Sequence, residues 1–292
     1  MKAKNDIYET EKYTDIRDMI NKSVEKYRDN TAFIVKNKVG NEVKYRNITF
    51  KETKEDMEAL GTALISLGLR NARVVVISPN RYEWVTTYLA VVNGVGVIVP
   101  LDRSLPENEM QGMLERSQAD AIIFDKKYKD TVRELKNNCE TINLRSYICM
   151  DDEEDGEFLS YTKLLEKGKK LIEENSNEAK EYKNAKIYPE KMSILLFTSG
   201  TTSKAKAVML SHKNLAEQIP ALRAVLNAWP GDVSLSFLPL HHTFGSLAIW
   251  YIFVSGATTV FCDGLKHIQE NLKEYGVTVF VTVPLVLETM YK

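Results

Sequence analysis

The chain lacks most features of secreted, membrane-spanning and nucleic-acid-binding proteins. Its three cysteines, Cys139, Cys149 and Cys262, stand far apart without paired metal-ligand spacing. They provide no disulfide framework and predict reduced, packed thiols of an intracellular protein. The 39 basic and 40 acidic residues leave a net charge of -1, so the chain offers no broad electrostatic footprint for nucleic acid or an anionic membrane.

Long apolar runs and hydrolytic motifs are also missing. The first residues have no apolar signal core, and no window approaches the roughly 18 unbroken apolar residues of a membrane helix, so a cytoplasmic location is expected. His241 and His242 are adjacent rather than spaced for a helical metal site, which makes a zinc site unexpected. No serine occupies a Gly-x-Ser-x-Gly elbow, so a hydrolase of that type would lack its nucleophile.

An alternation of strand and helix patterns begins at Arg73. This βαβ order predicts an α/β fold with mainly parallel sheets flanked by helices. Two helix starts resemble capping boxes, in which Asn80 precedes Glu83 and Ser104 precedes Glu107 by three residues. The predicted strands are 74–77, 95–99 and 121–124, and the predicted helices lie near 83–93 and 106–117.

The second half of the chain repeats this alternation. A Lys- and Glu-rich stretch from 161 to 186 is typical of an exposed helix ending in a connector. We therefore expect a first α/β subdomain at 1–186, with an N-terminal helical segment, and a second, incomplete subdomain at 187–292. Its predicted strands are 192–197, 207–210, 233–237, 257–261 and 277–281.

A hydroxyl-rich loop between two of these apolar strands carries the chemistry. Residues 198–203 contain five hydroxyl side chains and one glycine, and Lys204 and Lys206 follow closely. Backbone N–H groups, hydroxyls and a cation in such a loop can surround phosphate oxygens. The alternative is a flexible Ser/Thr-rich turn. A Walker-type P-loop does not fit, because Ala205, Lys206 and Ala207 stand where that pattern, counted from Gly200, continues to Gly-Lys-Ser/Thr.

The loop and its flanks resemble the signature of the adenylate-forming superfamily of acyl-CoA synthetases, luciferases and peptide-synthetase adenylation domains. That signature usually reads Thr-Ser-Gly-Thr-Thr-Gly-x-Pro-Lys-Gly-Val and is often continued by Leu-Ser-His. This chain departs from it at Ser203, Ala205 and Ala207. Segments 48–52, 78–84, 99–106 and 278–284 are similar to the same family. The residues in register are Thr198, Ser199, Gly200, Thr201, Thr202, Lys206, Val208, Leu210, Ser211 and His212.

The resemblance implies a fold and a set of site residues. The fold would be the large N-terminal domain of such an enzyme, truncated, with two similar layered subdomains. Segment 237–245 is similar to the family's Pro-Leu-x-His segment beside the acyl-adenylate, which makes His242 the catalytic candidate, although a histidine in an apolar segment is more often a core residue. Thr198 would also help to hold Mg²⁺. The loop residues that would bind the phosphates of ATP are Thr198, Ser199, Gly200, Thr201, Thr202, Ser203 and Lys206.

The resemblance also implies an activity. In the family, a carboxylate attacks the α-phosphorus of ATP, pyrophosphate leaves, and coenzyme A then takes the acyl group. A long-chain fatty acid-CoA ligase is the expected type, with a peptide-synthetase adenylation domain or a noncatalytic nucleotide-binding fragment as alternatives. The sequence ends before the family's adenine, ribose and C-terminal lysine segments. We therefore expect a truncated chain that is inactive alone and self-associates through exposed strand edges.

Overall fold

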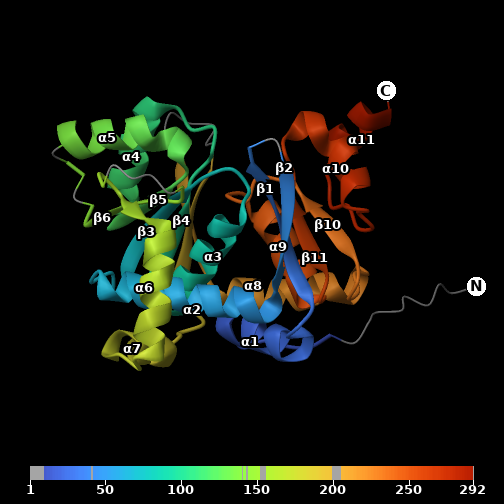
Figure 1. Ribbon diagram of the computed structural model, residues 1–292, viewed down its shortest axis with the longest axis horizontal. Helices are drawn as coiled ribbons and strands as arrows, with labels where there is room; N and C mark the ends of the chain where they lie inside the picture. Colours follow the sequence, from blue (N-terminus) through green and yellow to red (C-terminus); the bar gives the residue numbers. More distant parts are fainter. Residues whose placement is uncertain are drawn as a thin grey trace, which may run out of the picture. The chain divides into compact units, whose positions relative to one another are not determined.

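The computed structural model describes residues 10–40, 42–139, 141–142, 144–151, 156–198 and 205–291. The chain divides into two compact units, each containing one β-sheet (Figure 1). The four-stranded unit comprises residues 1–52 and 213–292, and the seven-stranded unit comprises residues 53–212. The expected division between residues 186 and 187 differs from this one. Strands at 192–198 and 206–211 join the sheet of the seven-stranded unit instead of opening a second unit.

The seven-stranded sheet has the order β7-β6-β5-β3-β4-β8-β9. All neighbouring pairs are parallel except β8 and β9, which form an antiparallel pair at one edge. The mainly parallel α/β architecture predicted from the strand and helix alternation is therefore confirmed. The strands are β3 (Ala72–Ile77), β4 (Gly96–Pro100), β5 (Ala121–Phe124), β6 (Ser146–Cys149), β7 (Leu159–Ser160), β8 (Met192–Thr198) and β9 (Lys206–Ser211).

Helices cover both faces of this sheet (Figure 1). A π-helical turn, η1 (Val91–Val95), separates the helix before it from β4, and a 3-10 turn, η2 (Lys126–Tyr128), follows β5. The α-helices are α2 (Phe50–Ser66), α3 (Tyr82–Ala90), α4 (Glu107–Ser117), α5 (Lys129–Asn138), α6 (Tyr161–Glu173) and α7 (Asn177–Asn184).

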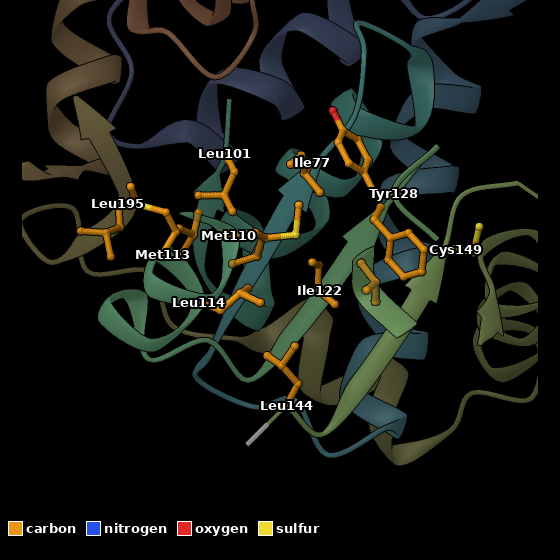
Figure 2. Packing of buried hydrophobic residues seen from close by; sticks show 14 residues of the cluster. Ile77, Leu101, Met110, Met113, Leu114, Ile122, Tyr128, Leu144, Cys149 and Leu195 are labelled. Carbon is orange, nitrogen blue, oxygen red and sulfur yellow. The ribbon is translucent and has the colours of Figure 1, made fainter. Parts of the chain in front are cut away.

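One apolar cluster lies between the sheet and α4 (Figure 2). Val75 and Ile77 of β3 pack in this cluster together with Met110 of α4. The intervening Val74 and Val76 are fully buried as well, so both faces of β3 are covered. Burial on both faces explains why the sequences of the parallel strands are unbroken apolar runs.

The stretch from 161 to 186, expected as one exposed helix with a connector, forms two helices instead. Ser160 caps α6 and Ser176 caps α7, each by accepting a backbone N–H bond. The first helix packs closely on α2, because a Cβ atom on Gly168 would lie 1.8 Å from the carbonyl oxygen of Ala59. Tyr161 is buried and donates a 2.9 Å hydrogen bond to Thr86, so one face of α6 belongs to the core.

The four-stranded sheet has the order β10-β11-β1-β2 and draws on both ends of the chain. Strands β1 and β2 form an antiparallel pair, which was not predicted from the sequence. The pairs β1–β11 and β10–β11 are parallel. Its elements are β1 (Thr31–Val39), β2 (Glu42–Thr49), β10 (Val233–Ser236), β11 (Thr258–Phe261), α1 (Ile16–Tyr27), α9 (Thr243–Val254), the 3-10 turn η3 (Leu265–His267), α10 (Ile268–Glu274) and α11 (Pro284–Tyr291). The helix α8 (His212–Val225) begins at the unit boundary.

Aromatic stacking and helix packing form the core of the four-stranded unit. Phe33 of β1 stacks on Phe253 and Phe261, with ring centroids 6.2 and 6.0 Å apart. Phe50 packs on Phe253 with centroids 4.5 Å apart. The N-terminal and C-terminal segments of this unit are therefore held together by buried rings.

Two local predictions were wrong. The N-cap residues of α3 and α4 are Arg81 and Pro106 and not the predicted Asn80 and Ser104, and neither Arg81 nor Pro106 makes a side-chain cap bond. A reciprocal capping box forms instead at α2, where Glu52 accepts from the backbone N–H of Thr49 at 2.7 Å and its own N–H donates to the Thr49 hydroxyl at 3.1 Å.

The strand predicted at 277–281 is also absent from the described structure of this segment. Only an isolated bridge pairs Val279 with Ser234. The Thr278 hydroxyl accepts from the backbone of Val233 and donates to Asp232 at 2.8 Å, so a side chain replaces part of a strand ladder. The segment is therefore anchored beside β10 without extending the sheet.

Candidate functional site

The β8–β9 hairpin brings together two of the predicted site residues. Thr198 and Lys206 are paired across the antiparallel ladder, as the last residue of β8 and the first of β9. Both side chains are exposed. The predicted phosphate-binding residues between them, Ser199, Gly200, Thr201, Thr202 and Ser203, lie outside the described residues. The described part of the hairpin therefore fixes where the loop begins and ends.

The loop leaves the sheet at its carboxyl edge. β8 runs parallel to β4, so Thr198 lies at the same edge as the residues that follow the carboxyl ends of the other parallel strands. Ligands of open α/β sheets bind at this edge. The position of the hairpin is therefore the one expected of a ligand-binding loop.

Arg116 of α4 supports the far end of the loop, a contact that the sequence did not indicate. Its guanidinium donates a hydrogen bond to the carbonyl oxygen of Ala205 and lies 5.2 Å from the ring centroid of Phe197. Ala205 also packs against the apolar cluster beneath α4. The alanine that replaces the family's usual proline is thus held by packing and by a backbone acceptor bond.

A second charged group lies at the carboxyl ends of β3, β5 and β6. Arg81 donates to Glu83 at 2.7 Å, to Asp125 at 2.9 Å and to both carboxylate oxygens of Asp151 at 3.0 Å. Burial by itself lowers the pKa of Arg81, but the charges and hydrogen bonds of Glu83 and Asp151 raise it above its ordinary value. The guanidinium stays charged and joins three strand ends, which favours a structural role.

His242 belongs to the four-stranded unit, whereas the hairpin belongs to the seven-stranded unit. It is the N-cap residue of α9, and its side chain is exposed. Its backbone N–H donates to Pro239 at 3.1 Å, and its carbonyl oxygen accepts from Ser246. A Cβ atom on Gly245 would lie 2.2 Å from the Pro239 carbonyl oxygen, so glycine is needed in this tight turn. The turn presents the His242 imidazole to solvent.

Among the described residues, no group of three or more His, Cys, Asp and Glu side chains is arranged to hold a metal ion. The three cysteines are free, and burial raises the pKa of the Cys149 thiol, which disfavours the reactive thiolate. No described helix is both long and apolar enough to span a membrane.

Comparison with known proteins identifies the family of the chain. Residues 20–292 match the family described as AMP-binding enzyme. The rat long-chain-fatty-acid–CoA ligase 5 is 30% identical over 266 residues, which are 85% of this chain and 38% of that protein. The Arabidopsis thaliana long-chain-fatty-acid–[acyl-carrier-protein] ligase AEE15 is 26% identical over 293 residues, which are 94% of this chain and 39% of that protein. The chain thus spans less than half the length of these relatives.

Solved structures share the fold. A long-chain-fatty-acid-CoA ligase from Archaeoglobus fulgidus has a TM-score of 0.79 and 22% identity, covering 97% of this chain and 54% of that one. The N-terminal domain of FACL13 from Mycobacterium tuberculosis has a TM-score of 0.75 and 14% identity, covering 96% of this chain and 65% of that one. Because the family match extends over residues 20–292, the chain belongs to the AMP-binding enzyme family.

Proposed function

We propose that the chain is the N-terminal part of an ATP-dependent ligase that activates a carboxylic acid as an acyl-adenylate and transfers it to coenzyme A. The observation that carries this proposal is the β8–β9 hairpin. It places Thr198 and Lys206 opposite each other, at the two ends of a hydroxyl-rich loop on the carboxyl edge of a parallel sheet.

The described residues fit a phosphate ligand. Lys206 is exposed, so its ammonium group is accessible to an anion. Thr198 supplies a hydroxyl on the facing strand. A cation and hydroxyls at a loop of this kind match the charge and the hydrogen-bond acceptors of phosphate oxygens. We assign the phosphates of ATP to Thr198, Lys206 and the loop residues 199–203.

The same place offers magnesium few protein ligands. Mg²⁺ prefers six oxygen ligands and is usually held by few protein groups together with substrate phosphates and water. The Thr198 hydroxyl is one such oxygen, and the described residues add no carboxylate cluster around it. We therefore propose Thr198 as a single protein ligand of a magnesium ion that arrives with ATP.

The proposed roles of the residues follow from charge. When bound, ATP supplies the phosphorus that the carboxylate attacks, and coenzyme A supplies the thiol that receives the acyl group. Lys206 would neutralise the charge that accumulates on the departing pyrophosphate and hold it in line, which is how such sites lower the barrier. His242 is exposed at the start of α9, and we propose that it contacts the carboxylic acid substrate.

We propose a long-chain fatty acid as the carboxylic acid. The proposal rests on the relatives, since the rat protein and the Arabidopsis protein are both named for long-chain fatty acids. Because the chain spans 38% of the rat protein, we further propose that these 292 residues alone bind nucleotide phosphates without catalysing either half-reaction. Robust carboxylate-dependent exchange of pyrophosphate into ATP by the isolated chain would contradict that statement.

Calorimetric titration of the chain with Mg-ATP and with magnesium pyrophosphate tests the site. Lys206→Ala removes the proposed cation, and Lys167→Ala, an exposed lysine on α6, is the matched control. We expect Lys206→Ala to weaken both ligands about tenfold, the loss of a charge-assisted phosphate contact of about 1.5 kcal/mol, while the control binds as the parent does. Equal binding by Lys206→Ala and the parent would contradict the phosphate-loop assignment.

A further inference from the structure

A cavity of about 400 Å³ lies in the seven-stranded unit, and the proposed ligase chemistry does not use it. Its walls come from the segments that precede β3, β4 and β8, with Asn71, Gly96 and Met192 among them. All of these residues lie at the amino ends of parallel strands. Since Thr198 ends β8 at the opposite edge of the sheet, the cavity and the phosphate loop lie at opposite ends of the same strand.

The wall of the cavity contains a buried hydroxyl that lacks a partner. Ser193 of β8 lines the cavity and is 3% exposed. Its hydroxyl makes no hydrogen bond to any residue that the structure describes. A buried hydroxyl left unpaired costs about 1–3 kcal/mol. Rotation about its single χ1 bond would let a ligand in the cavity supply the missing bond.

Two lysines of the cavity lining lie beside one aromatic ring. The ring of Tyr188, itself part of the lining, holds the ammonium group of Lys186 at 5.1 Å and that of Lys191 at 4.2 Å from its centroid. Neither lysine forms an ion pair with a carboxylate in the described part of the chain. Glu190 is the one acidic residue between them in the sequence. The aromatic ring therefore holds two cations in the lining of the cavity.

The other charged residues of the lining neutralise each other. Arg70 donates hydrogen bonds from two guanidinium nitrogens to the carboxylate of Glu181, and the hydrogen bond from Arg70 lowers the pKa of that carboxyl. Because this pair is internally compensated, the net charge that a ligand meets comes from Lys186 and Lys191. The histidine of the lining, His212, is buried.

Apolar side chains and closely packed backbone form another part of the lining. Val92, Val95 and Ile187 line it beside the π-helical turn η1. A Cβ atom on Gly96 would lie 2.1 Å from the carbonyl oxygen of Ala72, so glycine is needed where β4 passes β3. A lining that combines apolar side chains with placed polar groups is typical of small-molecule sites, and about 400 Å³ is within their range of volumes.

We propose that this cavity binds a small organic anion, a carboxylate or phosphate on an apolar body. The charged head would lie at Lys186 and Lys191, the apolar body among the valines, and a polar group within hydrogen-bond reach of Ser193. This second site is independent of the proposed ligase function, since none of its lining residues is assigned to ATP or to the acid.

Calorimetry with phenyl phosphate, benzoate and the neutral benzyl alcohol at low ionic strength tests this proposal. The double variant Lys186→Gln/Lys191→Gln should lower the affinity for the anionic probe about fivefold, which is the value of two exposed charge contacts. Ser193→Ala, which removes only the hydroxyl, should weaken it about threefold through the lost hydrogen bond. The control Lys167→Gln and the phosphate-loop variant Lys206→Gln should leave binding unchanged. Comparing phenyl phosphate with benzoate distinguishes a phosphate ligand from a carboxylate ligand.

Three outcomes would overturn the proposal. One is the lack of saturable binding by either anion. Another is equal binding of benzyl alcohol and the anions, which would remove the charged head from the ligand class. The third is loss of binding in Lys206→Gln together with full binding in the double lysine variant, which would move the probe to the phosphate loop. If Ser193→Ala fails to fold, the double lysine variant decides alone, because both lysines are exposed.

Discussion

The two sheets are stabilised in different ways. In the seven-stranded sheet, strands such as β3 and β5 are apolar and buried on both faces. In the four-stranded sheet, the outer strand β2 is exposed along most of its length and is fastened by polar contacts, including a hydrogen bond from Tyr45 to Glu274. The first sheet therefore depends on close packing, and the second depends at its outer strand on a few side-chain bonds. Each sheet should respond accordingly to substitution.

The largest expected effect is in the packed sheet. Phe124→Ala removes a fully buried ring that packs at right angles to Phe158 with centroids 5.1 Å apart. We expect a loss of about 3–5 kcal/mol in the free energy of unfolding, measured by urea titration followed by circular dichroism. The matched change on the outer strand, Val43→Ala, removes a side chain that is 43% exposed and should cost below about 0.5 kcal/mol. Similar losses in the free energy of unfolding for the two variants would contradict the difference between the packed sheet and the exposed outer strand.

A second prediction concerns backbone contact within the packed sheet. Gly96→Ala forces a methyl group to within 2.1 Å of the Ala72 carbonyl oxygen, and we expect a loss of about 2–3 kcal/mol as β3 and β4 move apart. Gly112 of α4 is the control, because a Cβ atom there meets nothing within 4 Å. Gly112→Ala should stabilise the chain by about 0.5–1 kcal/mol in the same titration. A tolerated Gly96→Ala would show that the strands are not closely packed there.

The strands of the two sheets also differ in how well they could be predicted from the sequence. Strands β3, β5 and β8 were predictable because burial on both faces requires unbroken apolar runs, as in Val74, Val75 and Val76. Strands β1 and β2 were not, since exposed positions place lysines and arginines along them, and Asp263, the side-chain partner of Lys36, lies 227 residues away. Strands such as β6 and β7 are too short to show a recognisable pattern of apolar and polar residues.

The candidate site was predictable only where a contiguous segment carries it. Thr198 and Lys206 were assigned from one segment, and the hairpin register that pairs them agrees with their positions. Their roles remain proposals. The contacts of Arg81 with Asp125 and Asp151 span 44 and 70 residues, and that of Arg116 with Ala205 spans 89. Such long-range pairs follow from the topology of the sheet and leave no local signal in the sequence.

The cap of α2, next to β2, gives an intermediate effect. Thr49→Ala removes the hydroxyl that accepts from the Glu52 backbone at 3.1 Å and donates to the Glu52 carboxylate at 2.9 Å. We expect a loss of about 1 kcal/mol in the free energy of unfolding. Thr49→Ser keeps the hydroxyl and should recover most of it. Equal losses in the two variants would assign the effect to the strand preference of threonine instead of the cap.

The smallest effect tests the polar fastening of the outer strand by pH. Burial alone raises the pKa of Glu274, but hydrogen bonds from Lys36 and Tyr45 lower it below its ordinary value of 4.5. Because the folded pKa is depressed, this carboxylate contributes its full stability above about pH 4.5 and loses it as the pH falls through the folded pKa. Glu274→Gln should therefore be less stable than the parent at pH 7, by less than about 1 kcal/mol for this mostly exposed group.

Denaturant titrations of both proteins from pH 7 to pH 3 measure the effect. The stability difference between them should shrink as the pH falls below about 4.5. A difference that stays constant over the whole range would show that the carboxylate charge does not stabilise the outer strand.

The phosphate loop is the central claim, and amide hydrogen exchange with and without magnesium pyrophosphate tests it most directly. We predict slower exchange at the end of the β8–β9 hairpin formed by Thr198 and Lys206, and unchanged exchange at Met192 and Ser193 at the other end of β8. Protection confined to the Ser193 end, or protection at neither end under saturating ligand, would contradict the assignment of this hairpin as the phosphate-binding element.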